Sequence, residues 1–540
     1  MFSWWRSFGL TALSLAVALL AFALMVKAEL GPRGDLPLQI DEWYFATCAA
    51  RGNAAGEAPL TGCHDNKGPL IFPIYQLLSD PQQPYAESRF KWGGFGLALI
   101  NAALLAALAR RVVGRGSASL AFSLMLLCAA GSTMYVTLKT EPLGLSFVLA
   151  GLLVLAHAQR PAPPWRLVST GALFGLSLLA KQTYVFALLG LVVSALVQHA
   201  ACWPSGRGAR LKAVAMLLLG AGLPFALLLA VFAVAGKLLP LLASLFLYPS
   251  LYVDPSATPH PSALARWAWR FGQLAEAMRP HLPLLMLAVP GVVLSLVVDR
   301  KRASVDGEAA ATGLQGPLVS VLLGLLALLL VAPIMFPYHL MPMLVLAIVP
   351  ACAFLLGIKQ AVQRASPTLL RAGQWSLLLL AALWTLSVWF GPGGRSNTGR
   401  ELFGFEKIDT GGARYGYVVG AWPEFFTFNG LVPASEVMYP NGLPGVPSFW
   451  GFQRPDPESL KGRFLTVVQQ YNAAKLTADF AKTPPRFIHV VDAMARSPGL
   501  AAPTDIPLLA DYITRHCQLL RHVPGRMQYA GSLYQCSNGR

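Results

Sequence analysis

The sequence predicts a polytopic α-helical membrane protein with a small α/β domain at its C-terminal end, and three observations support this prediction. The 540 residues are 55% hydrophobic and only 12% charged, which is about half the charged fraction of a soluble protein. Apolar runs long enough to cross the hydrocarbon core of a bilayer recur along most of the chain. From residue 392 onward the composition changes to that of a soluble domain.

The chain is predicted to cross the membrane about eleven times within residues 1–391. The first apolar run is too long for the core of a signal peptide and lacks a small-residue cleavage motif before Lys27, so we interpret it as a retained helix. The expected spans are 8–28, 93–110, 117–137, 143–158, 166–180, 183–200, 213–235, 282–299, 317–334, 341–358 and 374–391.

The distribution of Lys and Arg predicts the orientation. Basic segments follow every second span, and they read "ARRVVGR", "AQRPAPPWR", "SGRGARLK", "DRKRAS" and "KQAVQRASPTLLR". The positive-inside rule places that side in the cytoplasm, so the N-terminus is inside. A first outer loop (30–91), a second long outer loop (236–281) and the tail are then outside. The same rule accounts for the net charge of +17, so nucleic acid is not an expected partner.

The seven cysteines divide by location. Cys48 and Cys63 share the first outer loop, while Cys517 and Cys536 share the tail. Because both regions are expected to face an oxidising compartment, each pair is a disulfide candidate. The others lie in or beside apolar spans, where a thiol behaves as a small apolar group: Cys128, Cys202 and Cys352.

The tail, residues 392–540, is predicted to fold as a separate α/β domain. The segments "RYGYVVGA" and "RFIHVVDA" have the composition of buried strands. Between them, "DPESLKGRFLTVVQQYNAAKLTADFAK" is expected to form a helix with Asp456 as its N-cap. Strand, helix and strand in this order favour a small α/β fold, closed by two further strands near the end of the chain.

Two adjacent acids after the first span are the leading catalytic candidates. Asp41 and Glu42 lie in "LQIDEWYFATCAARG", preceded by apolar residues and followed by three aromatics, of which Tyr44 is a supporting polar group. An apolar setting makes a carboxylate a stronger base, suited to general base catalysis. Neighbours on a helix point about 100° apart, so the two acids can serve different partners. The alternative is a pair of solvated loop charges.

Further polar groups gather in the other outer segments. Lys67 in "HDNKGPL" has the charge to neutralise a phosphate, or else it is an interfacial lysine that reaches toward the headgroups. Glu141 either serves a site or complements the dipole of the following helix. His64 and its neighbour Asp65 do not make a tetrahedral ligand set, so no metal is expected. The remaining candidates are Lys181, Tyr338, His339 and Arg270.

Acids and cations at the outer membrane face suit a substrate with a lipid tail and a phosphate. In such a site Lys or Arg binds the phosphate, and a carboxylate deprotonates an incoming hydroxyl or amine.

Five segments in order carry a family resemblance across about residues 1–360: "DEWYFATCAARG", "NKGPLIFPIYQLL", "TEPLG", "GLSLLAKQTYV" and "YHLMPMLVLAIVP". Together they resemble the GT-C membrane glycosyltransferases, particularly the branch of protein O-mannosyltransferases and the lipid A aminoarabinose transferase. The resemblance implies transfer of a sugar from a polyprenyl-phosphate donor, with inversion at the anomeric carbon. It also implies a bacterial inner-membrane protein whose active site faces the periplasm, and no cofactor besides the donor.

The resemblance also implies roles for single residues. Asp41 corresponds to the general base and Glu42 to the acid that orients the acceptor. Lys67 corresponds to a lysine near the donor phosphate, although the family's Lys-Pro-Pro is Lys67-Gly68-Pro69 here. Lys181, Tyr338 and His339 are likewise expected at the phosphate, with Tyr338-His339 in place of the family's Arg-Tyr or Lys-Tyr. Glu141 is expected to support the site, and most relatives have Asp at its position. His64 and Arg270 are supporting candidates from their own outer loops rather than from the resemblance.

Two other function classes stay open on the sequence. An O-antigen-ligase-like transferase would take a pyrophosphate-linked donor and use arginines of the second outer loop, where Arg266, Arg270 and Arg279 lie. A secondary transporter would place polar groups near the middle of the bilayer, whereas these spans are nearly free of them. The sugar is not identified by the sequence, nor is the acceptor, which is a glycan, a lipid or a protein.

Overall fold

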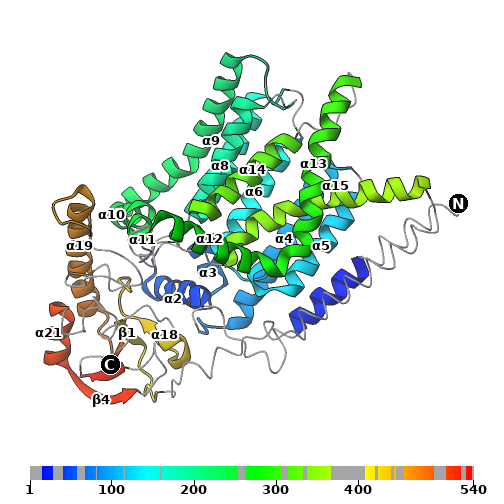
Figure 1. The fold of residues 1–540 in the computed structure, drawn as a ribbon. Helices are drawn as coiled ribbons and strands as arrows, with labels where there is room; N and C mark the ends of the chain where they lie inside the picture. Colours follow the sequence, from blue (N-terminus) through cyan, green and yellow to red (C-terminus); the bar gives the residue numbers. More distant parts are fainter. Residues whose placement is uncertain are drawn as a thin grey trace. The chain divides into compact units, whose positions relative to one another are not determined.

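The computed structural model is mostly helical, with one small sheet near its C-terminal end (Figure 1). It describes residues 15–27, 40–57, 67–80, 82–114, 116–157, 161–198, 200, 202–252, 262–305, 314–331, 337–365, 408–419, 424–438, 443–444, 455–491, 506–523 and 531–537.

The chain forms two compact units. The first, here called the helical unit, is Met1–Gly34, Gly94–Leu227 and His260–Ser396. The second, here called the sheet unit, is Asp35–Gly93, Leu228–Pro259 and Asn397–Arg540. The tail therefore forms one compact body with most of the first outer loop and with part of the second.

The helical unit consists mainly of apolar helices that overlap the expected spans, whereas the helix Ala263–Met278 lies in the predicted second outer loop (236–281). Its elements are α4 (Glu87–Val112), α5 (Ser117–Gly131), η1 (Thr133–Tyr135), α6 (Thr140–Ala156), α7 (Pro164–Ala180), η2 (Gln182–Tyr184), α8 (Val185–Val197), α9 (Arg207–Val234), α12 (Ala263–Met278), η5 (Arg279–His281), α13 (Leu282–Val305), α14 (Gln315–Val331), η6 (Pro337–Leu340) and α15 (Met341–Ala365). Of these, α4 and α9 also contribute residues to the sheet unit. A shorter helix occupies 15–27, and the expected span 374–391 lies outside the described residues.

The protein is an integral membrane protein. Among the described helices, Glu87–Val112, Arg207–Val234 and Tyr338–Ala361 are each long and apolar enough to cross a bilayer. The bent pair formed by α12 and α13 makes a fourth crossing if it is counted as one span. The other apolar helices are shorter, so the total of eleven crossings and their orientation stay predictions.

Small residues allow helices in the helical unit to approach closely, as α8 and α14 do (Figure 1). A Cβ at Gly190 of α8 would lie 2.2 Å from the carbonyl oxygen of Ser320, and one at Gly324 of α14 would lie 2.1 Å from that of Phe186. The two backbones therefore lie closer together than side chains would allow. This close approach increases the van der Waals contact that is a main source of helix association in lipid.

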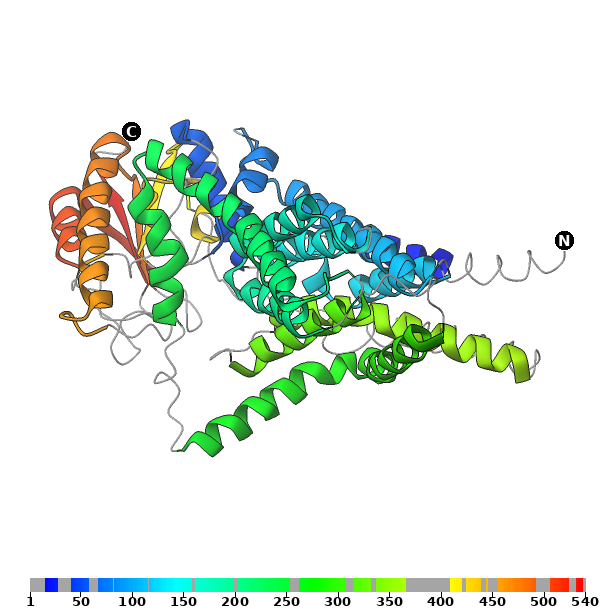
Figure 2. The same ribbon diagram turned by 90° about the horizontal axis from the view of Figure 1, so that it is seen from above.

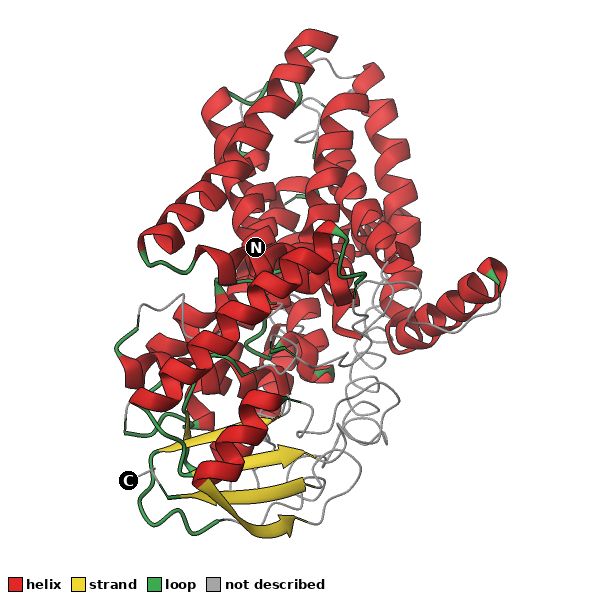
Figure 3. Cartoon of the chain, turned by 90° about the vertical axis from the view of Figure 1, so that its left-hand side faces the viewer, coloured by secondary structure: helices red, strands yellow, loops and turns green. Residues whose placement is uncertain are grey.

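The strands, yellow in Figure 3, form one sheet with the order β2-β1-β3-β5-β4. The strands β2, β1 and β3 are parallel, while β5 pairs antiparallel with both β3 and β4. Their bounds are β1 (Tyr415–Val419), β2 (Val432–Pro433), β3 (Phe487–Val491), β4 (Cys517–Val523) and β5 (Gly531–Cys536). The two strands and the closing pair expected from the sequence are β1, β3, β4 and β5.

Alternation along the strands divides the core between the two faces of the sheet. Tyr417 and Ile488 pack in the core between the sheet and the helices α19 (Leu460–Lys482) and α21 (Pro507–His516). In Figure 2 the ribbon of α19, drawn in orange, covers this face of the sheet. His489 points to the other face and stacks on Phe425 of α18 (Glu424–Asn429), with ring centroids 5.3 Å apart.

The predicted N-cap of the tail helix is wrong. Ser459, not Asp456, caps α19, because the Ser459 hydroxyl accepts the backbone N–H of Gly462 at 3.0 Å. The Asp456 carboxylate instead accepts the N–H of Glu458 in the preceding turn. The first turn of the predicted helix is therefore a separate turn that leads into the cap.

Helices from both outer loops complete the sheet unit. These are α2 (Ile40–Ala55), α3 (Ile71–Leu78), α10 (Leu238–Leu242), a π-helical turn η3 (Ala243–Leu247) and α11 (Tyr248–Tyr252). The apolar side chains of α10, η3 and α11 pack on Leu465 and Val468 of α19. On the other side of the sheet, α2 contacts β2 and α18.

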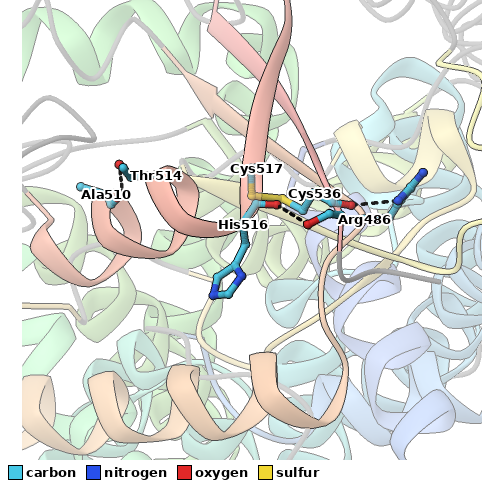
Figure 4. Close-up of a disulfide and its surroundings, with 7 residues drawn as sticks. Arg486, Ala510, Thr514, His516, Cys517 and Cys536 are labelled. Carbon is cyan, nitrogen blue, oxygen red and sulfur yellow. Dashed lines mark hydrogen bonds between the residues drawn. A yellow bond between two sulfur atoms is a disulfide. The ribbon is translucent and has the colours of Figure 1, made fainter.

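A disulfide joins Cys517 and Cys536, which lie opposite each other in the β4–β5 pair (Figure 4). The guanidinium of Arg486 donates to the carbonyl oxygen of Cys536 at 2.9 Å beside it. Cys48 is also disulfide-bonded, while Cys63 lies outside the described residues.

Candidate active site

The acid pair occupies the first turn of α2 in the sheet unit. Asp41 and Glu42 are adjacent, yet their environments differ: the Asp41 side chain is 23% exposed, whereas Glu42 is buried. Negative charge at a helix N-terminus is favourable because the helix dipole is positive there. One acid is therefore accessible to a substrate, and the other is part of the surrounding core.

Asp41 forms an ion pair with Lys67. The Lys67 ammonium lies 3.3 Å from Asp41 Oδ1, and its side chain is 15% exposed. The candidate base and one candidate phosphate ligand are thus brought together. Their predicted roles then require the pair to separate when a substrate phosphate replaces the Asp41 carboxylate beside Lys67.

Aromatic side chains of α2 and α3 pack together next to the acids and form their apolar surroundings. The ring of Phe45 contacts the rings of Phe72 and Tyr75, with centroids 5.7 Å and 5.3 Å apart. Tyr75 is fully buried, and its pKa is raised well above the ordinary value by burial and then by the charges of Glu42 and Asp41. Its phenol therefore stays protonated beside the acids. Tyr44 is also buried, with its ring against Phe45.

A second polar cluster lies in the helical unit, where the start of α6, the turn between α7 and α8, and η6 meet. We call it the lysine cluster; its residues are Lys139, Thr140, Glu141, Lys181, Tyr184, Tyr338 and His339. Lys181 directly follows α7, Glu141 lies in the first turn of α6, and Tyr338 and His339 lie in η6.

An ion pair is central to the lysine cluster. The Lys181 ammonium lies 2.8 Å from Glu141 Oε1, and the Thr140 hydroxyl donates to Glu141 Oε2 at 3.0 Å. The Tyr184 hydroxyl donates to the backbone carbonyl of Glu141 at 2.6 Å. Glu141, Lys139 and Lys181 are all largely buried, so they lie in a setting where charge interactions are weakly screened.

The ring of Tyr338 joins the two lysines. The ammonium groups of Lys139 and Lys181 lie 5.0 Å and 5.6 Å from its centroid, within cation–π range. The imidazole of His339 packs edge-on against Tyr338, with centroids 4.8 Å apart. Two ammonium groups held by an aromatic face and a carboxylate are preorganised to bind a phosphate, whose charge ammonium groups neutralise well.

Lys139 is a functional candidate that the sequence analysis missed. It directly precedes Thr140 and Glu141 in "LKTEPLG", a segment in which only the acid was predicted to serve a site. The available signal was the position of Lys139 at the same outer turn as Glu141.

The other candidates lie elsewhere. Arg270 donates from Nη1 to the carbonyl oxygen of Leu330 at 2.9 Å and lies 5.6 Å from the ring centroid of Trp267. It therefore satisfies the C-terminal end of α14. His64 lies outside the described residues. Within the described part of the chain, no group of three or more His, Cys, Asp or Glu side chains is arranged to hold a metal.

Comparison with known proteins finds no matching family model and no matching curated sequence. Solved structures to which the chain is similar include the oligosaccharyltransferase AglB from Archaeoglobus fulgidus, in complex with an inhibitory peptide and a dolichol-phosphate. That match has 14% identity and a TM-score of 0.47, and covers 94% of this chain and 73% of AglB. ArnT from Cupriavidus metallidurans bound to undecaprenyl phosphate is similar at 13% identity and a TM-score of 0.39, over 98% of both chains.

Both of these proteins are GT-C membrane glycosyltransferases, the group that the sequence motifs resemble. Identities of 13–14% and TM-scores below 0.5 are too low for the likeness to support a function or to identify a site residue.

Proposed function

We propose that the protein is a glycosyltransferase that moves a sugar from a polyprenyl-phosphate donor to an acceptor hydroxyl or amine at the outer face of the membrane. The lysine cluster carries the proposal, because it offers two buried ammonium groups, an aromatic face and a phenol hydroxyl on one set of rigid helix ends. A phosphate on a lipid tail is the ligand that this chemistry and a membrane setting favour together.

In the proposed reaction Asp41 takes the proton from the acceptor as the acceptor atom attacks the anomeric carbon. The new bond to the acceptor forms while the bond from the sugar to the phosphate oxygen breaks, which inverts the anomeric centre. Polyprenyl phosphate leaves with the bonding electron pair, and Lys67, which lies beside Asp41 in the same unit, neutralises the charge that develops on it. Glu42 and Tyr75 hold the surroundings of Asp41 fixed.

The decisive experiment supplies membranes containing the protein with a panel of labelled polyprenyl-phosphate sugars. Asp41→Asn is expected to lower transfer by about 10² to 10⁴-fold, the usual contribution of a general base. Asp511→Asn is a matched control, because Asp511 forms an exposed ion pair with Arg515 on α21. Equal transfer by wild type and Asp41→Asn would remove Asp41 as the base.

The same panel tests the lysine cluster. Lys181→Met is expected to raise the donor KM strongly, and Lys181→Arg to retain part of the binding because the charge is kept. Release of polyprenyl pyrophosphate from pyrophosphate-linked donors alone would instead favour the ligase. One of the three arginines on which that alternative depends, Arg270, already binds the end of α14.

A further inference from the structure

A network of buried charges in the sheet unit has no part in the lysine cluster or the acid pair. Its three cations are Arg51, Lys237 and Lys475, and its three anions are Glu57, Glu436 and Asp479. Glu436 is completely buried, and Arg51 and Asp479 are each 4% exposed. Charges are rarely buried so deeply unless they are paired. Removal of one partner would leave the other charge buried without compensation, which is strongly destabilising.

The network joins segments that lie far apart in the sequence. Lys237, at the start of α10, lies 2.9 Å from Glu57 Oε2 and 2.6 Å from Glu436 Oε2. Glu57 lies two residues after the end of α2, and Glu436 lies three residues after the end of β2. One ammonium group, that of Lys237 in the second outer loop, therefore forms ion pairs with a carboxylate of the first outer loop and with one of the tail.

The last turns of α2 are held by α19. Arg51 Nη2 lies 3.8 Å from Glu57 Oε1 and 3.7 Å from Asp479 Oδ1. Asp479 in turn accepts the hydroxyl of Ser435 at 2.8 Å and pairs with Lys475. The guanidinium of Arg51 thus lies between a carboxylate of its own segment and one of the tail.

The first turn of α2 is held by the tail as well. The Trp43 ring, next to the acid pair in sequence, packs against Phe428 of α18 with centroids 6.2 Å apart. Beyond α2, the Tyr85 hydroxyl donates to the carbonyl oxygen of Leu431 at 2.6 Å. The tail therefore contacts α2 close to Asp41 and again at Arg51, so both ends of this 16-residue helix are fixed by the same domain.

We propose that the buried charge network is a positioning device, in which Arg51, Glu436 and Asp479 fix α2 so that the acids in its first turn face the substrate in one orientation. This inference rests on the proposed function. The tail is then a working part of the catalytic apparatus, and its residues act through α2 without touching the substrate. Charged pairs suit this task because they fix geometry more narrowly than apolar contacts do.

The test uses the full-length protein with Glu436→Gln, which keeps the shape of the side chain and removes its charge. Two quantities are measured: hydrogen exchange of the α2 amides, and the kcat and donor KM of transfer. We expect exchange protection in α2 to fall at least tenfold and kcat to fall about 10 to 100-fold, with the donor KM within threefold of wild type. Asp511→Asn again serves as the control and is expected to change neither quantity.

A second variant covers the case in which Glu436→Gln does not fold. Lys237→Met with Glu436→Gln removes one cation and one anion, so the remaining network stays balanced. We expect this pair to fold, and to lower α2 protection and kcat in the same direction but by less.

Either of two results would overturn the inference: unchanged protection of α2, or lost protection with an unchanged kcat. A general loss of tail structure is recognised by exchange in β3 and β5, which should stay at the wild-type level. Wild-type protein that consumes no donor would refute the proposed function instead. In that case hydrogen exchange of the α2 amides would still show whether the charge network stabilises that helix.

Discussion

At the scale of single residues, the shape of the lysine cluster depends on a glycine. A Cβ added at Gly144 would lie 2.2 Å from Cε2 of Tyr184 and 2.7 Å from its Cδ2. The absence of a side chain there lets the Tyr184 ring lie against the first turns of α6, where its hydroxyl reaches the carbonyl of Glu141. Gly144 is therefore a determinant of the cluster although it carries no functional group.

Gly144→Ala is expected to displace Tyr184 and to destabilise the helical unit by about 1–3 kcal/mol, the usual cost of overpacking. The change is measured as a lower midpoint of thermal unfolding in detergent, together with weaker donor binding. Gly96→Ala in α4 is the matched control, because a Cβ at Gly96 would meet nothing within 4 Å. A similar loss in both variants would show that the effect is not specific to Tyr184.

Most residues of the acid pair and the lysine cluster could be proposed as candidates from the sequence, but the side chains that they contact could not. Asp41 and Lys67 are 26 residues apart in the sequence, and no local pattern predicts that their side chains pair. Arg51 and Asp479 are more than 400 residues apart, and no local pattern marks such a contact. Lys139 was visible, since it shares a turn with Glu141.

At the scale of elements, apolar runs predicted the long helices, and residue composition predicted the strands β1 and β3. The long hydrophobic stretches mark helices because a 20-residue apolar run has few other stable forms. The strands β1 and β3 were expected from their β-branched and aromatic residues. The two-residue strand β2 and the short helix α18 were not, because elements of this length are defined by their tertiary contacts rather than by a repeating pattern.

The disulfide is expected to stabilise the β4–β5 pair. Cys517 and Cys536 are 19 residues apart, and closing a loop of that length contributes roughly 3 kcal/mol by the chain-entropy estimate. Cys517→Ser with Cys536→Ser should lower the opening free energy of β4 and β5 by about that amount, measured by hydrogen exchange of their amides.

The control for that pair is Cys128→Ala with Cys352→Ala, which changes two buried thiols of the helical unit. We expect it to leave exchange in β4 and β5 unchanged. Unaltered protection in the Cys517/Cys536 variant would mean that sheet pairing alone holds the strands.

At the scale of the whole molecule, a buried histidine makes the stability of the sheet unit depend on pH. His489 is completely buried, and burial lowers its pKa to about 4 from an ordinary value of 6.5. Between these two values the unfolded chain binds a proton that the folded chain does not. Acid therefore favours unfolding in this window, and stability rises with pH until about 6.5.

The expected slope is about 1.4 kcal/mol per pH unit between pH 4 and 6.5, with little change above that range. It is measured as the free energy of opening of β3 from hydrogen exchange, corrected for intrinsic rates. His489→Phe keeps an aromatic ring on Phe425 and should remove the contribution of this group. His522→Gln alters an exposed histidine of β4 and should keep the wild-type slope; a flat wild-type profile would contradict the prediction.

The division of the sheet unit among three separate stretches has a consequence for biosynthesis. The stretch 35–93 is translated first, yet the tail that packs on α2 begins only at residue 397. At 5–20 residues per second, the ribosome needs roughly 15–60 s to make the intervening chain. The helix with the proposed catalytic acids therefore waits, without its tail contacts, while most of the other helices are inserted. Synthesis of the last segment thus completes the sheet unit, and a nascent chain halted before that point retains the acids without the domain that orients them.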